Sequence, residues 1–86
     1  MLAELPGWEL HDSAIRRVFL FGGFPEAVGF VVRLGFEAEA ADHHPDMLIS
    51  YKRVMVTYST HSAGGLTEKD FDGADAANRL AAGTGG

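Results

Sequence analysis

Three of the four histidines lie in a pattern that could carry proton-transfer chemistry. His43 and His44 are adjacent and precede Pro45, and His61 follows after a stretch long enough for one β-hairpin. Because the two ends of a hairpin return to each other, the third histidine can come close to the first two. Glu39 precedes His43 by one helical turn, so both side chains share a helix face if the last turn persists to His43. Spacing alone therefore indicates a pocket that three imidazoles and one carboxylate could share.

Structural explanations of the same residues remain open. Two histidines before a proline also suit the C-terminus of a helix, where positive charge is favourable. His61 could be an ordinary loop residue, and Glu39 could belong to a solvated helix face beside other acidic residues. Asp70 has a structural role available, because the segment 67–70 resembles a helix capping box with Asp70 as its last residue. His11 lies next to a turn and is expected at the surface.

Two kinds of chemistry are compatible with clustered histidines. A zinc site is the first, because catalytic zinc often takes three protein ligands. However, the side chains of consecutive residues diverge, and no cysteine or second carboxylate is placed to complete a tetrahedron. Metal-free acid–base catalysis is favoured, since histidine exchanges protons near neutral pH and crowding with a carboxylate can keep one ring protonated while another is neutral. No phosphate-binding glycine loop and no nucleophile elbow competes with this interpretation.

Composition limits the class of protein. The chain has 86 residues, enough for one domain over 1–86, with 1–6 as a lead-in and 82–86 as a flexible tail. Its formal charge is −5 and its lysines and arginines are scattered, so direct binding of nucleic acid is disfavoured. It has no cysteine, no signal-peptide pattern and no apolar run of the roughly 18 residues that a membrane span requires. We expect a cytoplasmic protein without a membrane segment.

The pattern of apolar residues predicts two β-hairpins, each followed by a helix. The predicted strands and helices cover residues 8–11, 15–21, 24–41, 47–51, 54–60 and 67–80. The first helix should end by His43 or His44, because a residue before proline resists helical angles. The order β-β-α-β-β-α needs no crossover connection. We therefore expect an α+β fold: a four-stranded, mostly antiparallel sheet with two main helices packed on one face, and an N-terminal helix that is short or absent.

The first predicted helix is apolar over more than one face. One stripe consists of Ala27, Val31, Leu34 and Ala38, and a second consists of Val28, Val32 and Phe36. A sheet can cover only one side of a helix, so part of this surface should be shared with another subunit.

At this point the residues resemble the signature of the pterin-4a-carbinolamine dehydratase family. The signature runs Glu39, three residues, His43-His44-Pro45, five residues, Tyr51, nine residues, His61, eight residues and Asp70. The flanks agree as well, among them Gly7-Trp8 and the run STHSAGGLTEKD over 59–70. The resemblance covers about residues 5 to 80. It has two departures: many relatives have Trp at the position of Met47, and few residues precede Gly7, where the family usually has a helix.

The resemblance implies a hydro-lyase that dehydrates 4a-hydroxytetrahydropterin to quinonoid dihydropterin. Such an enzyme serves tetrahydropterin recycling after an aromatic amino acid hydroxylase, and it needs neither a metal nor a bound cofactor, since the pterin is its substrate. The resemblance also implies a homodimer or homotetramer, with the second apolar stripe as a packing surface. Some animal members bind a homeodomain transcription factor as dimerisation cofactors, so a protein-binding role without catalysis is the alternative. A small zinc-dependent hydrolase is a third, less favoured interpretation.

The resemblance places the pterin among three histidines. The candidate catalytic residues are His43, His44, His61 and Glu39. We expect His43 and His61 to be the proton-transfer pair and His44 to orient the pterin. Glu39 would fix the tautomer and ring angle of His43. The predicted substrate-binding residues are His43, His44, Pro45, Thr60, His61, Ser62, Ala63 and Asp70, with no metal ligand.

Overall fold

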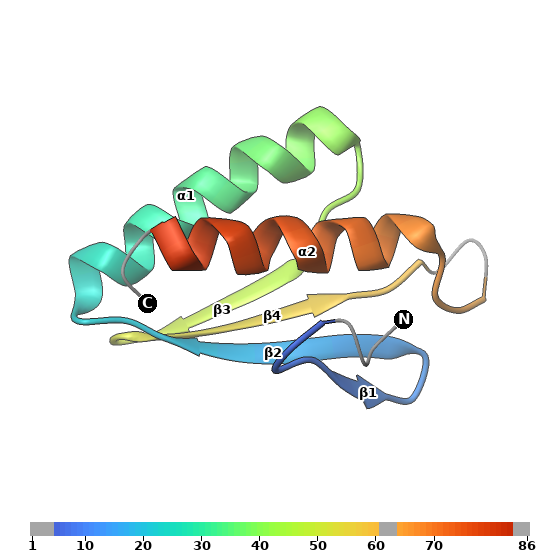
Figure 1. Ribbon diagram of the computed structural model, residues 1–86, viewed down its shortest axis with the longest axis horizontal. Helices are drawn as coiled ribbons and strands as arrows, with labels where there is room; N and C mark the ends of the chain where they lie inside the picture. Colours follow the sequence, from blue (N-terminus) through green and yellow to red (C-terminus); the bar gives the residue numbers. More distant parts are fainter. Residues whose placement is uncertain (1–4, 61–63, 84–86) are drawn as a thin grey trace.

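The fold is a four-stranded antiparallel sheet with two helices on one of its faces, as seen in a computed structural model (Figure 1). The structure describes residues 5–60 and 64–83. Its elements are β1 (Glu9–His11), β2 (Ala14–Leu20), α1 (Phe24–Ala41), β3 (Asp46–Ser50), β4 (Arg53–Tyr58) and α2 (Glu68–Gly83). In space the strands follow the order β1-β2-β4-β3. The predicted α+β class, element order and sheet are confirmed.

Two tight turns with left-handed residues form the hairpins. Asp12 connects β1 to β2 with a φ of 54°, and Tyr51 connects β3 to β4 with a φ of 56°. Aspartate tolerates this conformation, whereas a bulky tyrosine adopts it rarely. β2 and β4 pair in the centre of the sheet from Ile15–Tyr58 to Leu20–Arg53. This pairing places the end of β4 beside the start of β2 and directs Tyr58 towards the helices.

Helix α1 ends at Ala41, as its predicted range 24–41 has it, ahead of the limit that Pro45 sets. Pro25 and Glu26 occupy its first turn, as expected from the tolerance of that turn for proline and for negative charge. At the other end Asp42 adopts a left-handed conformation with a φ of 52°. The N–H of His43 then donates to the carbonyl of Ala38 at 3.1 Å, closing the helix. His43 therefore lies outside the helix, so the condition for a contact between Glu39 and His43, a last turn that persists to His43, is not met.

The core lies between the sheet and the helices. Alternate residues of β2 and β4 point into it, and α1 contributes Phe30 and Leu34, both 0% exposed. The buried residues that helix α2 contributes to the core cluster are alanines, with Phe71 and Leu80 half-buried against it. Because alanine is small, α2 can approach the sheet closely. Of the predicted inner stripe of α1, Ala27, Leu34 and Ala38 are buried and Val31 is half-buried, while the fully buried Phe30 was not part of that stripe.

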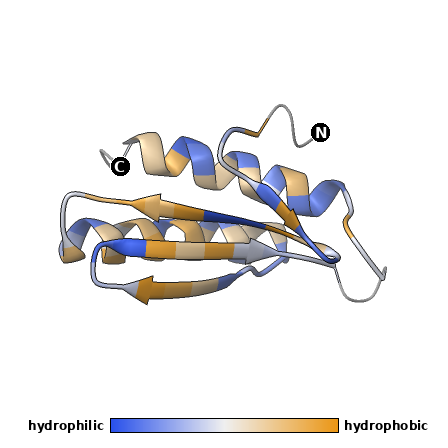
Figure 2. Cartoon of the chain, turned by 90° about the horizontal axis from the view of Figure 1, so that it is seen from below, coloured by the Kyte–Doolittle hydropathy of each residue, from blue (hydrophilic) through white to orange (hydrophobic). Residues whose placement is uncertain are grey.

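Apolar side chains also remain on the surface. On α1, two residues of the predicted second stripe are exposed, Val32 by 52% and Phe36 by 75%, while Val28 is half-buried. The sheet face opposite the helices carries further apolar residues on its strands (Figure 2), with Leu20 and Leu48 each 60% exposed. Neither described helix is long and apolar enough to cross a membrane.

Near both ends of the chain, the described residues pack or form helix where a lead-in and a flexible tail were predicted. Leu5, within the predicted lead-in, is 6% exposed and belongs to the core, and its carbonyl accepts a hydrogen bond from the N–H of Trp8. Helix α2 continues to Gly83, two residues into the predicted flexible tail. Ala81 explains this extension, because it is 4% exposed and joins the core at the last turns of the helix.

Candidate active site

A buried carboxylate at the start of α2 organises the site. Asp70 is 0% exposed and lies in the first turn of the helix. Its Oδ2 accepts hydrogen bonds from the N–H of Thr67 at 2.9 Å and from the hydroxyl of Thr60 at 2.6 Å. The hydrogen bond from the Thr67 N–H to the Asp70 carboxylate is one of those that define a capping box, so the predicted capping role of Asp70 is confirmed. The same side chain also ties the end of β4 to the start of α2.

The second oxygen of Asp70 binds His43. His43 Nε2 lies 2.6 Å from Asp70 Oδ1, and the His43 side chain is 14% exposed. Burial raises the pKa of the Asp70 carboxyl, but the hydrogen bonds from Thr60, His43 and the Thr67 N–H outweigh it and hold the pKa below its usual value. Asp70 is thus a carboxylate at neutral pH. A carboxylate only accepts hydrogen bonds, so His43 Nε2 is the donor in this pair.

An aromatic ring supports the His43 imidazole. The ring of Tyr58 lies at an interplanar angle of 20° to His43, with 5.8 Å between centroids. Burial, with the nearby charges of Asp70 and Glu37, raises the pKa of the Tyr58 phenol to about 12. Tyr58 is therefore a neutral phenol over the physiological range. Sequence reasoning did not select Tyr58 for the site, because nothing in its spacing indicated that it faces His43.

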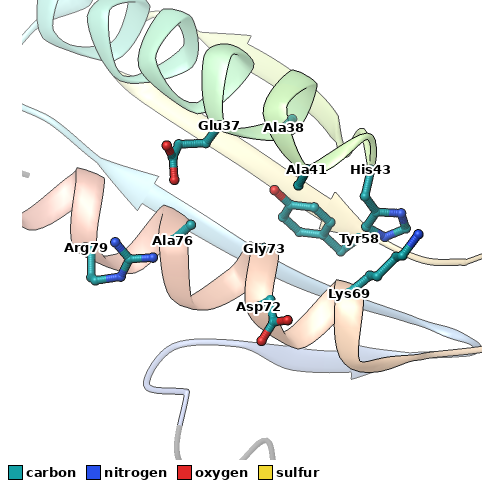
Figure 3. A pocket seen from close by; sticks show the side chains of 10 residues that line it. All are labelled: Glu37, Ala38, Ala41, His43, Tyr58, Lys69, Asp72, Gly73, Ala76 and Arg79. Carbon is teal, nitrogen blue, oxygen red and sulfur yellow. The ribbon is translucent and has the colours of Figure 1, made fainter.

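A cavity of about 340 Å³ opens between α1 and α2 beside these two rings (Figure 3). His43 and Lys69 lie at one end of the cavity, and Arg79 lies towards the other. Within the described part of the chain, the lining residues are Glu37, Ala38, Ala41, His43, Tyr58, Lys69, Asp72, Gly73, Ala76 and Arg79. Among the predicted site residues that the structure describes, only His43 belongs to this lining. The remaining predicted residues that the structure describes lie around His43, outside the cavity.

The predicted contact between Glu39 and His43 is wrong. Glu39 Oε1 instead lies 2.8 Å from His44 Nε2, in a pair whose side chains are 81% and 58% exposed respectively. The cause is the end of α1 at Ala41: once Asp42 leaves helical geometry, His43 no longer follows the face that carries Glu39. His43 turns to Asp70, and the neighbouring His44 takes the Glu39 carboxylate.

Two of the remaining predicted site residues, Pro45 and Thr60, are among those that the structure describes. Pro45 is half-buried and leads from the histidines into β3, while Thr60 lies within hydrogen-bond distance of Asp70. His61, Ser62 and Ala63 lie outside the described residues. Within residues 5–60 and 64–83, no three histidine or acidic side chains converge in a way that could hold a metal ion.

The comparison with protein families shows which family contains this chain. The family model for pterin 4 alpha carbinolamine dehydratase matches residues 1–80. The chain belongs to the pterin-4a-carbinolamine dehydratase family. The resemblance read from the histidine signature is thereby confirmed. The His43–Asp70 pair joins two segments of that signature across the fold.

Bacterial relatives in the dehydratase family are close to this chain. A protein of Picosynechococcus sp. named "Putative pterin-4-alpha-carbinolamine dehydratase" is 55% identical over 71 residues, covering 83% of this chain and 77% of its own. A protein of the same name from Chloroflexus aurantiacus is 53% identical over 70 residues, covering 81% and 75%. The match extends over most of both chains, so the dehydratase family likeness is not confined to the histidine motif.

Two solved structures share this fold. A "transcriptional coactivator/pterin dehydratase from Brucella Melitensis" superposes with a TM-score of 0.90 at 43% identity, covering 93% of this chain and 87% of that chain. A pterin dehydratase-like protein described as a RuBisCO assembly factor of the α-carboxysome superposes with a TM-score of 0.71 at 19% identity, covering 86% of each chain. The second likeness concerns the fold alone.

Proposed function

We propose that this protein is a 4a-hydroxytetrahydropterin dehydratase. In the reaction the C4a–O bond of the carbinolamine breaks, the leaving hydroxyl takes a proton to become water, and the ring loses a proton to form the quinonoid dihydropterin. The lone pair on N5 helps to expel the hydroxyl, so the protein has only to supply and remove protons. The observation that carries the proposal is a histidine of the family signature held by a buried carboxylate, His43 on Asp70.

His43 is the proposed acid–base residue in the described part of the chain. Its Nε2 donates to Asp70, so the proton exchanged with the substrate would be carried by the other ring nitrogen, Nδ1. The Asp70 carboxylate would compensate the positive charge that the ring gains when Nδ1 is protonated, as the aspartate does in a Ser-His-Asp triad. His61 is proposed as its partner in proton transfer.

Asp70 takes the role that the sequence assigned to Glu39. Because Asp70 is 0% exposed and uses both oxygens on protein donors, it would position His43 and not contact the pterin. Glu39 would then orient His44, which is exposed and would contact the substrate. Pro45, Thr60, Ser62 and Ala63 complete the proposed wall of the pterin site. The reaction as proposed uses no metal and no cofactor.

A direct rate measurement tests the activity. Freshly generated 4a-carbinolamine is followed by stopped-flow absorbance with and without the protein. Loss of one well-placed acid or base typically lowers a rate by about 10² to 10⁴. His43→Ala and His61→Ala should each lower the enzymatic rate by that much, while His11→Ala, on the exposed hairpin, should leave it unchanged. If neither His43→Ala nor His61→Ala changed the rate, the assignment would be wrong.

Two alternatives make opposite predictions in simple assays. A zinc-dependent hydrolase would contain about one equivalent of zinc and would lose activity on chelation. A protein-binding role is suggested by the solved Brucella relative, whose title names it both a transcriptional coactivator and a pterin dehydratase. Such a role would not depend on the histidines. If His43→Ala abolished dehydration but left the binding of a partner protein intact, the two functions would belong to separate surfaces.

The cellular setting follows from the proposed reaction. A cytoplasmic homodimer or homotetramer would accept the hydroxylated pterin released by an aromatic amino acid hydroxylase. The exposed stripe of α1, with Val32 and Phe36, is the proposed packing surface between subunits. A hydroxylase gene beside the gene for this chain would support the link.

A further inference from the structure

The Tyr58 ring is enclosed between aromatic neighbours and helix α2. Tyr58 is the last residue of β4 and is 2% exposed. The rings of His43 and Trp8 both contact it, with centroids at 5.8 Å and 6.2 Å and interplanar angles of 20° and 48°. Tyr58 therefore connects the candidate acid–base residue to the rigid part of the core.

Gly73 of α2 makes this position possible. A Cβ added at Gly73 would lie 2.4 Å from Tyr58 Cζ and 2.8 Å from its hydroxyl oxygen. Contacts this short do not occur, so the phenol ring can lie there only because residue 73 has no side chain. Gly73 lies within α2, and its φ is not positive. A glycine inside a helix costs stability relative to alanine, and close packing against Tyr58 gives a physical reason for keeping it.

The Tyr58 ring restrains a motion of His43 that the Asp70 bond leaves open. A hydrogen bond at Nε2 fixes the distance to Asp70 Oδ1, but the imidazole can still tilt about that contact. The Tyr58 ring, nearly parallel to the imidazole and offset from it, opposes this tilt, because tilting would separate the two rings or force them to overlap. The two contacts together determine the direction of Nδ1.

We propose that Tyr58, held in place through Gly73, is a positioning residue that fixes the ring plane of His43. The contact is made by the aromatic ring, so the phenol hydroxyl is dispensable. The catalytic meaning of this inference rests on the proposed dehydratase function, in which Nδ1 exchanges a proton with the substrate. The structural part, that Tyr58 holds the imidazole plane, stands by itself and can be tested without substrate.

The first test compares Tyr58→Phe with Tyr58→Leu. The histidine ring resonances are followed by NMR, with His43 assigned by its loss in a His43→Gln spectrum and the exposed His11 as internal reference. Tyr58→Phe should keep the ring-current displacement of the His43 signals, whereas Tyr58→Leu should abolish it. In stopped-flow assays, Tyr58→Leu should lower kcat on the order of 10- to 100-fold with little change in KM, as expected for a misdirected catalytic group. Tyr58→Phe should restore the wild-type value.

The second test measures the Tm of Gly73→Ala variants. It shows whether Tyr58 and Gly73 are in contact, independently of any misfolding of Tyr58→Leu. Gly73→Ala should lower the Tm of the wild type, because the new methyl group meets the Tyr58 ring. In the Tyr58→Leu background the same change should cost little or raise the Tm, since leucine does not reach as far. Gly35→Ala is the matched control: it also lies within a helix, nothing lies within 4 Å of its added Cβ, and it should raise the Tm in both backgrounds.

The outcomes separate this inference from the proposed function. His43 signals and kcat that are unchanged in Tyr58→Leu would overturn it, as would an equal loss of Tm for Gly73→Ala in both backgrounds. If the wild-type protein lacked dehydratase activity, the proposed function would fall, but the NMR and Tm comparisons would still decide whether Tyr58 holds His43. Should Tyr58→Leu alone fail to fold, the double variant Y58L/G73A partly refills the vacated space and serves for the NMR comparison.

Discussion

His43 Nε2 and Asp70 Oδ1 lie 2.6 Å apart, although 27 residues separate them in the chain. The first follows helix α1 and the second lies in the first turn of α2, so the contact joins the two helical segments at one end of the sheet. Because Asp70 is buried and accepts hydrogen bonds from two further donors, the position of its carboxylate does not depend on His43. This relationship gives His43 a defined donor nitrogen, from which the following predictions are drawn.

Replacing the charge on Asp70 should impair catalysis more than folding. Asp70→Asn keeps the size of the side chain but no longer accepts strongly from His43 Nε2, so the imidazole loses its preferred tautomer. We expect the dehydration rate to fall by about 10²-fold or more, with a loss of about 1 to 3 kcal/mol in the free energy of unfolding. Stopped-flow absorbance and urea unfolding measure the two effects. Asp12→Asn, in the exposed turn between β1 and β2, is the control and should change neither, because asparagine also tolerates the left-handed conformation. A fully active Asp70→Asn variant would contradict the role given to this pair.

The stability conferred by Asp70 should disappear in acid. Its pKa is lowered in the folded state, whereas the unfolded chain takes up the proton near the ordinary value of about 3.9. The bonded carboxylate therefore contributes fully above that value. As the pH falls below it, the unfolded state is protonated first, and the contribution is lost as the pH passes through the folded pKa. The difference in unfolding free energy between wild type and Asp70→Asn should shrink from about pH 6 to about pH 3. A difference that stayed constant would mean that Asp70 is not the group responsible.

Glu39 should matter less than Asp70. Both side chains of the Glu39–His44 pair are exposed to solvent, and exposed ion pairs contribute little to positioning or stability. Glu39→Gln should lower the dehydration rate by less than about 10-fold, and the effect should weaken further at high salt. Measured beside Asp70→Asn under the same conditions, the two variants rank the carboxylates. A larger loss for Glu39→Gln would restore Glu39 as the main orienting residue.

The exposed stripe of α1 should control subunit association. Phe36 is 75% exposed, and burial of a large aromatic side chain at the centre of an interface is typically worth about 2 kcal/mol or more. Phe36→Asp should therefore raise the dissociation constant of the assembly at least about 10-fold. Sedimentation velocity over a range of concentrations measures this change, with circular dichroism as a check on folding. Leu20→Asp, on the opposite face of the sheet, is the comparison. An unchanged mass distribution for Phe36→Asp would exclude this surface as an interface.

Much of the fold could be predicted because its signals are local. Alternation of apolar residues along β2 and β4 and the apolar periodicity of α1 each depend on neighbours within a few residues. Turn-forming residues then limit where each element can begin or end. The order of hairpins and helices leaves few ways to cover one face of a single sheet, which is why class and topology could be predicted without coordinates. The bounds of α1 were predicted as well, but not the left-handed turn at Asp42, which closes the helix before Pro45 would force it to end.

By itself, the sequence determined the class of fold, the family and the residue types available for chemistry, through short-range periodicity and through fixed spacings of histidines and acids. Tertiary structure alone decided which acid meets which histidine. The choice between Glu39 and Asp70 depends on where the chain turns after Ala41 and on how α2 packs beside β4. The same is true of Tyr58, whose place beside His43 exists only because Gly73, on another element, leaves room for its ring. Such contacts arise from the meeting of distant segments in a close-packed interior, and no spacing along the chain encodes them.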